Sequence, residues 1–87
     1  MELSDFEIIT QRPDLERLAK QLLREEVVAV DTEADSFYHY FDKVCLVQIA
    51  TRDGCWLVDP IALGGAAELE PLGPVFASPK VKVLFHA

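Results

Sequence analysis

The chain has 87 residues, of which 51% are hydrophobic, and a formal net charge of −7. This length suffices for one small domain, and the apolar content excludes a disordered chain. An acidic chain has no overall electrostatic affinity for nucleic acid, so such a partner requires a local basic patch or a bound metal ion. No apolar run reaches the roughly 20 residues that span a bilayer, and the N-terminus lacks a secretory signal. We therefore expect a cytoplasmic protein without a membrane partner.

The first quarter of the chain predicts a short strand followed by an amphipathic helix. Residues 6–10 alternate weakly between apolar and polar side chains and predict an edge strand. Pro13 suits the first turn of a helix, which we expect to end between residues 24 and 26. The apolar stripe that should pack this helix on a sheet consists of Leu15, Leu18, Leu22 and Leu23.

Residues 27–33 are a short run of β-branched and small apolar residues that ends in two carboxylates, Asp31 and Glu33. Such a run predicts a strand buried on both faces. Side chains on a strand repeat with period two, so both carboxylates point to the same side of the sheet. They repel each other unless a cation lies between them or one takes up a proton, and a divalent metal ion resolves this conflict. The alternative is a strand that runs out into a solvated acidic turn.

Residues 34–43 are polar but contain five ring side chains, at Phe37, Tyr38, His39, Tyr40 and Phe41. One interpretation is a platform on which nucleic-acid bases stack, because every base offers a π-face. The other is a hairpin connection whose rings pack on neighbouring side chains, with His39 as a surface histidine. The sequence leaves both open.

Residues 44–50 and 55–59 predict two further strands, joined by a turn at residues 52–54. Gly54 suits a left-handed bulge position in that turn. Together with residues 27–33, these strands form a meander of three antiparallel strands in which we expect the carboxylate strand to be central.

The two cysteines, Cys45 and Cys55, fall on these consecutive strands. The turn offsets them by about five residues along the ladder, roughly 15 Å, which is too far for a disulfide. We expect two free, buried thiols in a reducing compartment.

The last third of the chain predicts a helical crossover to a final strand. Residues 61–67 contain Gly64-Gly65 and predict a loop, and residues 69–76 predict a short helix interrupted by prolines. Residues 80–85 then form a strand parallel to residues 27–33. Because no helix follows to cover this strand, we expect the front part of a larger domain, with self-association or dependence on further residues.

These stretches together resemble the ribonuclease D-like members of the DEDD 3′–5′ exonucleases, over residues 6–87. Residues 28–33, Val-Ala-Val-Asp-Thr-Glu, resemble the first exonuclease motif, and residues 82–87, Lys-Val-Leu-Phe-His-Ala, the opening of the second. Residues 44–49 and 56–60 resemble the two strands between them. The resemblance implies an α/β, ribonuclease H-like fold, a mixed sheet in which the antiparallel meander is extended by a parallel strand, here truncated.

The family removes mononucleotides from the 3′ end of RNA or DNA with two divalent ions, Mg²⁺ or Mn²⁺. By resemblance, Asp31 and Glu33 are catalytic metal ligands: Asp31 bridges both ions, and Glu33 binds the ion that activates the attacking water. Thr32 would lie close to the terminal nucleotide through its backbone. His86 would shape the approach of the substrate, or be a strand-end histidine with a local hydrogen bond.

The chain departs from the family pattern because only two of the four family carboxylates are present. The second motif is cut after His86-Ala87, and the third motif, with the general base, is absent. We therefore expect residues 1–87 to be the N-terminal part of an exonuclease domain, inactive alone within an active parent. Two alternatives stay open: a polymerase-type proofreading exonuclease domain, and a catalytically dead nucleic-acid-binding or protein-interaction module of the same fold.

Overall fold

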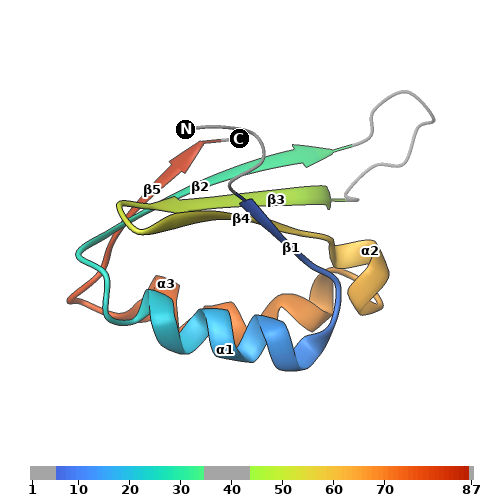
Figure 1. Ribbon diagram of the computed structural model, residues 1–87, viewed down its shortest axis with the longest axis horizontal. Helices are drawn as coiled ribbons and strands as arrows, with labels where there is room; N and C mark the ends of the chain where they lie inside the picture. Colours follow the sequence, from blue (N-terminus) through green and yellow to red (C-terminus); the bar gives the residue numbers. More distant parts are fainter. Residues whose placement is uncertain (1–5, 35–43, 87) are drawn as a thin grey trace.

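A five-stranded mixed sheet in the order β1-β4-β3-β2-β5 organises the structure, a computed structural model (Figure 1). It describes residues 6–34 and 44–86, and only the backbone of residues 33–34 and 44–45. The strands are β1 (Phe6–Ile9), β2 (Val27–Ala34), β3 (Val44–Thr51), β4 (Gly54–Val58) and β5 (Lys82–His86). The helical segments are α1 (Arg12–Leu22), α2 (Pro60–Leu63), the 3₁₀ segment η2 (Ala66–Leu72) and α3 (Gly73–Ala77). None of the described helices is long and apolar enough to cross a membrane.

Strand pairing confirms the expected meander and crossover. β2, β3 and β4 pair antiparallel, whereas β5 runs parallel to β2, and β1 runs parallel to β4 at the edge of the sheet. The expectation that the carboxylate strand is central is wrong: β3 is the middle strand of the meander and of the sheet, and β2 lies between β3 and β5. Asp31 on β2 therefore has a paired neighbour on each side, Gln48 on β3 and His86 on β5.

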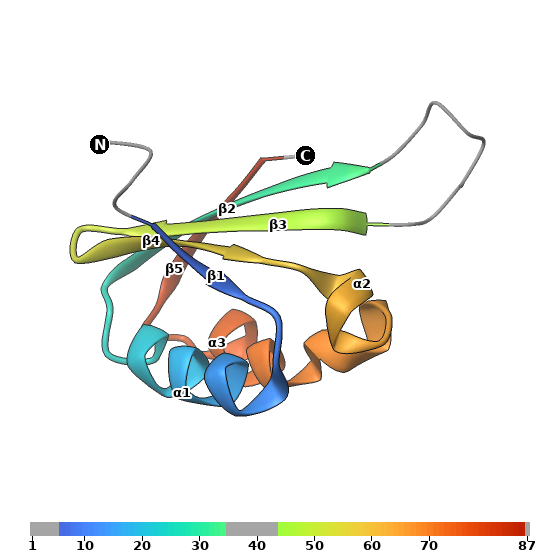
Figure 2. The same ribbon diagram turned by 45° about the vertical axis from the view of Figure 1, so that its right-hand side comes forward.

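The prediction that residues 27–33 are buried on both faces is wrong. Val28 and Val30 are buried, whereas Val27 and Ala29 are exposed. The cause is the layering: α1 and the crossover lie together on one side of the sheet (Figure 2). No element of the described residues covers the opposite side, which we call the open face.

The core lies between the sheet and α1, and it corrects the predicted leucine stripe. Leu15, Leu18 and Leu22 are buried as expected, but Ala19 takes the place assigned to Leu23. α1 ends at Leu22, and Leu23, the residue that caps it, is 42% exposed. The helix is therefore two to four residues shorter than predicted.

The crossover from β4 to β5 is more helical than the predicted loop. The Asp59 carboxylate accepts a hydrogen bond from the Ala62 backbone N–H at 3.1 Å and starts α2, which Gly64 ends at a φ of +114°. η2 contains Pro71 within 3₁₀ geometry, and α3 follows it directly. Leu72 is buried in this crossover, which delivers the chain to β5.

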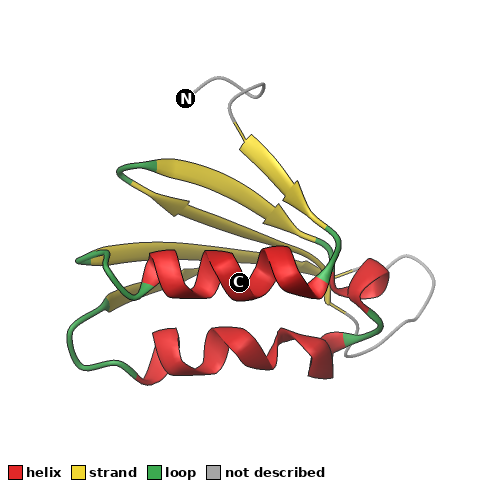
Figure 3. Ribbon diagram, turned by 60° about the horizontal axis from the view of Figure 1, so that its bottom comes forward, coloured by secondary structure: helices red, strands yellow, loops and turns green. Residues whose placement is uncertain are grey.

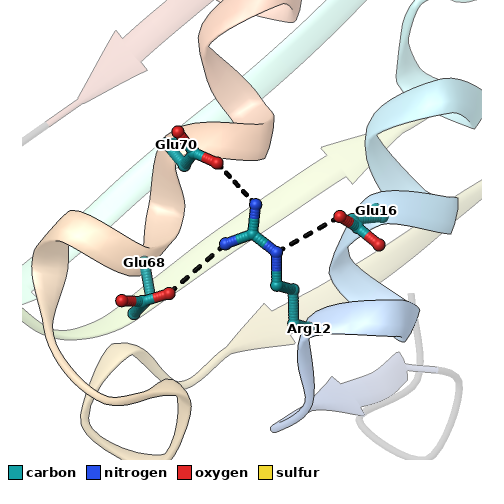
Figure 4. A network of polar contacts seen from close by, with 4 residues as sticks. All are labelled: Arg12, Glu16, Glu68 and Glu70. Carbon is teal, nitrogen blue, oxygen red and sulfur yellow. Dashed lines mark hydrogen bonds and ion pairs between the residues drawn. The ribbon is translucent and has the colours of Figure 1, made fainter.

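An exposed ion network joins the start of α1 to the crossover (Figure 4). The Arg12 guanidinium contacts Glu16 at 3.2 Å, Glu68 at 3.3 Å and Glu70. The hydrogen bond to Glu70 is the main reason that the pKa of Arg12 is raised. The charge of Arg12 is therefore engaged within the fold.

The hairpin between β3 and β4 has the register on which the thiol prediction rested. Thr51 pairs with Gly54 and Ala50 pairs with Cys55, so Cys45 and Cys55 are five positions apart along the ladder. Cys55 is a free, buried thiol, as predicted. The side chain of Cys45 lies outside the described residues.

Candidate active site

The candidate site starts with Asp31, near the end of β2 on the open face. Because Val28 and Val30 alternate into the core, the residue after Val30 must point the other way. The Asp31 side chain is 45% exposed, so its carboxylate is open to solvent ions. Glu33 follows two positions later, opposite Leu46, which places it on the same face by period, while its side chain lies outside the described residues.

His86 lies beside Asp31, on the neighbouring parallel strand. The register of β2 and β5 sets the two residues opposite each other, and His86 Nδ1 is 3.3 Å from Asp31 Oδ1. When Nδ1 carries a proton, it donates a hydrogen bond to the carboxylate. The side chains of His86 and Asp31 are 84% and 45% exposed, so the pair is open to solvent. Both residues were predicted from the sequence as site residues, but their contact was not, although the predicted parallel pairing of their strands indicates it.

Gln48 is a site residue that sequence reasoning missed. It pairs with Asp31 from β3, so Gln48, Asp31 and His86 form a polar row across three strands of the open face. This row borders a hollow of about 280 Å³, whose other lining residues include Ala29, Ala50 and Leu84. The signal was available, since Gln48 interrupts an otherwise apolar strand.

Thr32 does not join this row. It pairs with the buried Val47, and period two turns its side chain to the face that the helices cover. Thr32 is next to Asp31 on β2, so its backbone, but not its side chain, lies near the polar row. The predicted approach of this backbone to the terminal nucleotide stays a prediction, and the ring side chains at residues 37–41 lie outside the described residues.

The donor set around Asp31 fits a divalent ion that prefers oxygen ligands. Asp31 offers a partly exposed carboxylate, and Glu33 follows on the same face of the strand. Such ions take six or more oxygen ligands, of which water supplies several. Among the side chains that the structure describes, which do not include Glu33 and Cys45, no three His, Cys, Asp or Glu cluster at metal-binding distance. The described residues therefore provide part of a ligand set.

Comparison with known proteins identifies the family. Residues 6–87 match the family model described as 3′–5′ exonuclease. Ribonuclease D of Gluconacetobacter diazotrophicus is 39% identical over 80 residues, which cover 92% of this chain and 20% of that protein. Protein RRP6-like 3 of Arabidopsis thaliana is 37% identical over 87 residues, 99% of this chain and 10% of that protein.

A solved structure extends the likeness to the fold. The catalytic core of RRP6 from Trypanosoma brucei has a TM-score of 0.86 at 34% identity, and the match covers 100% of this chain and 24% of that one. The expected α/β mixed-sheet fold is thus confirmed. The chain spans a fifth or less of the two curated relatives named above. It belongs to the 3′–5′ exonuclease family, in the branch of ribonuclease D and Rrp6.

Proposed function

We propose that the protein is a metal-dependent exonuclease that shortens RNA from its 3′ end, with Asp31 at the reaction centre. The observation that carries the proposal is the position of Asp31: a carboxylate at the rim of an open hollow, beside His86 and Gln48, in a chain of this family. RNA is favoured over DNA because several relatives are named ribonuclease D.

Asp31 and Glu33 would hold Mg²⁺ or Mn²⁺ through carboxylate oxygens. Bound ions of this kind supply an ionised water near neutral pH and neutralise charge on the leaving oxygen. The chain's own residues orient the site. His86 restrains Oδ1 of Asp31 by its contact at 3.3 Å, and Gln48 borders the hollow with a side chain able to donate and accept hydrogen bonds.

A catalytically dead module that binds nucleic acid is the second candidate. The observation in its favour is the polar contact of Asp31: among the described side chains it is made by a ring nitrogen of His86 and not by a second carboxylate. Self-association through the open face and a cytoplasmic location stay predictions.

A Mn²⁺ titration followed by NMR tests whether the metal ion binds at Asp31 and Glu33, as the proposed enzyme requires. Paramagnetic broadening should begin at residues 31–33 and at His86, because Asp31 and Glu33 offer oxygen ligands there. Glu68 and Glu70 are the internal control, since both carboxylates already contact Arg12. Broadening that starts at this pair would contradict the assigned site.

The matching activity assay uses the full-length protein and RNA labelled at its 5′ end. We expect a ladder of products that shorten progressively from the 3′ end, with Mg²⁺ or Mn²⁺ and not with a chelator. Binding of the RNA without any shortening would favour the dead module.

A further inference from the structure

A cationic surface lies on the outer side of α1, away from the open face. Arg17, Lys20 and Arg24 recur at spacings of three and four residues, so they share one side of the helix and its C-terminal extension. Leu15, Leu18 and Leu22 occupy the buried side. With Gln21, the three cations line a hollow of about 480 Å³. We call Arg17, Lys20 and Arg24 the α1 cationic face.

This surface concentrates positive charge in an acidic chain. Residues 12–24 hold four of the eight Lys and Arg residues but only two of the fifteen Asp and Glu residues. Glu16, four residues before Lys20, has its ion pair with Arg12. Among the described residues, Arg17 pairs with Asp14 at 2.8 Å, and no carboxylate pairs with Lys20 or Arg24.

The ordinary explanation of the α1 cationic face is a helix surface that is simply solvated. Solvation alone does not require that the positive side chains be separated from carboxylates. The carboxylates of η2 are engaged by Arg12, and the hollow of the α1 cationic face has no carboxylate in its lining. Arg17 and Arg24 are seven positions apart, which is about 10 Å at the helical rise and more than one phosphate group occupies. The charge and length of the surface therefore fit a chain of phosphates better than a single anion.

We propose that the α1 cationic face binds the phosphate backbone of RNA and holds the body of the substrate while its 3′ end reaches Asp31. The inference rests on the proposed function and adds a second contact surface to it. α1 lies in the helical layer on one side of the sheet (Figure 3), whereas Asp31 lies on the open face. An RNA must therefore pass round the sheet to reach both, so only RNAs longer than a few nucleotides would use the surface.

The test measures RNA binding by the full-length protein without added metal and with a chelator present, so that hydrolysis does not interfere. The variant is Lys20→Gln with Arg24→Gln, which removes the two charges that pair with no described carboxylate and keeps long side chains with good helix propensity. The matched control is Lys80→Gln with Lys82→Gln, which removes two exposed charges elsewhere. Fluorescence anisotropy compares a tetranucleotide with an RNA of about 20 nucleotides, which exceeds the footprint of a typical single-strand site.

Each single-strand phosphate contact contributes about 0.7 to the slope of log affinity against log salt, so two lost contacts lower it by about 1.4. Between about 50 and 200 mM salt, that slope corresponds to a roughly sevenfold change in the ratio of wild-type to variant affinity. We expect this sevenfold change in the affinity ratio for the longer RNA and the α1 variant. For the tetranucleotide, we expect the affinity of the variant to equal that of the wild type.

Unchanged affinity for the longer RNA, or an equal loss in the control variant, would overturn the proposal. So would a wild-type protein that does not bind the longer RNA at all. The same variants can be tested for binding to vesicles of anionic phospholipid. If the α1 variant loses affinity for the vesicles but not for RNA, the partner of this surface is a membrane and the proposal is wrong. The proposed function fails separately, if RNA binds normally but is not shortened when Mg²⁺ or Mn²⁺ is restored.

Discussion

Substitution of Leu72 by alanine tests whether the crossover is part of the core that positions β5 and His86. Leu72 is 2% exposed and belongs to the central hydrophobic cluster. Replacing a buried leucine by alanine removes transfer free energy and leaves a cavity, with a combined cost of about 2–5 kcal/mol. A chain of 87 residues has a total stability of about 4–13 kcal/mol. The substitution should therefore remove a large fraction of the free energy of unfolding.

Urea unfolding can be followed through Trp56, the single tryptophan, which is buried on β4. With a slope of about 1–3 kcal/mol per molar urea, a loss of about 3 kcal/mol lowers the midpoint by roughly 1–3 M. The control is Ile61→Ala in the same crossover, where the side chain is 62% exposed, and its effect should stay within about 0.5 kcal/mol. Equal midpoints for the two variants would refute the packing described for the crossover.

Three further predictions concern pH, backbone conformation and thiols. A hydrogen bond with Asp53, together with burial, raises the pKa of Glu25 above its ordinary value of 4.5, so the folded state holds this proton more tightly than the unfolded state. Stability from this group is present below pH 4.5 and is lost as pH rises through the raised pKa, and Glu25→Gln should flatten that part of a pH series of urea unfolding curves. Gly64→Ala should destabilise by about 1–2 kcal/mol because φ is +114°, whereas Gly73→Ala, at φ −53° with free space around it, should be neutral or stabilising in the same assay. Thiol labelling of the denatured, non-reduced chain should modify both Cys45 and Cys55, and a mass two hydrogens lower without labelling would contradict the strand register.

Local patterns predicted the strands well because their signal is strong within a few residues. The turn after Thr51 fixed the register that separates Cys45 from Cys55, while the common side of Asp31 and Glu33 stays a prediction from the period of two. The parallel pairing of β5 with β2 followed from the crossover rule. These inferences required no knowledge of tertiary packing.

The errors concern features that depend on what lies above or beside a residue. An apolar run does not reveal whether one or two layers cover it, so the exposure of Val27 and Ala29 was missed. Gly54 was assigned to a left-handed turn, but its φ is not positive. A Cβ atom there would lie 3.1 Å from the Trp56 ring, which explains the glycine by close approach.

The candidate site was predicted only in part, because some of its residues are brought together by strands that are distant in the sequence. Asp31 stood out because charge follows an apolar strand, whereas Gln48, although it interrupts an apolar strand, is placed beside Asp31 only by the strand register. The contact between Asp31 and His86 joins residues that are 55 positions apart in the sequence. The predicted parallel pairing brings the two strands together, but the register that sets Asp31 opposite His86 is seen only in the structure.

The most direct measurement of the central claim is release of 3′ mononucleotides from end-labelled RNA by the full-length protein, with and without Asp31→Asn. We predict metal-dependent release by the wild type and a loss of at least about 100-fold in the variant, about 2.7 kcal/mol of transition-state stabilisation. The matched control is Asp14→Asn, which changes a carboxylate of similar exposure that pairs with Arg17 on α1. An active protein that Asp31→Asn leaves unchanged would contradict the assignment of the site, and so would an equal loss in Asp14→Asn.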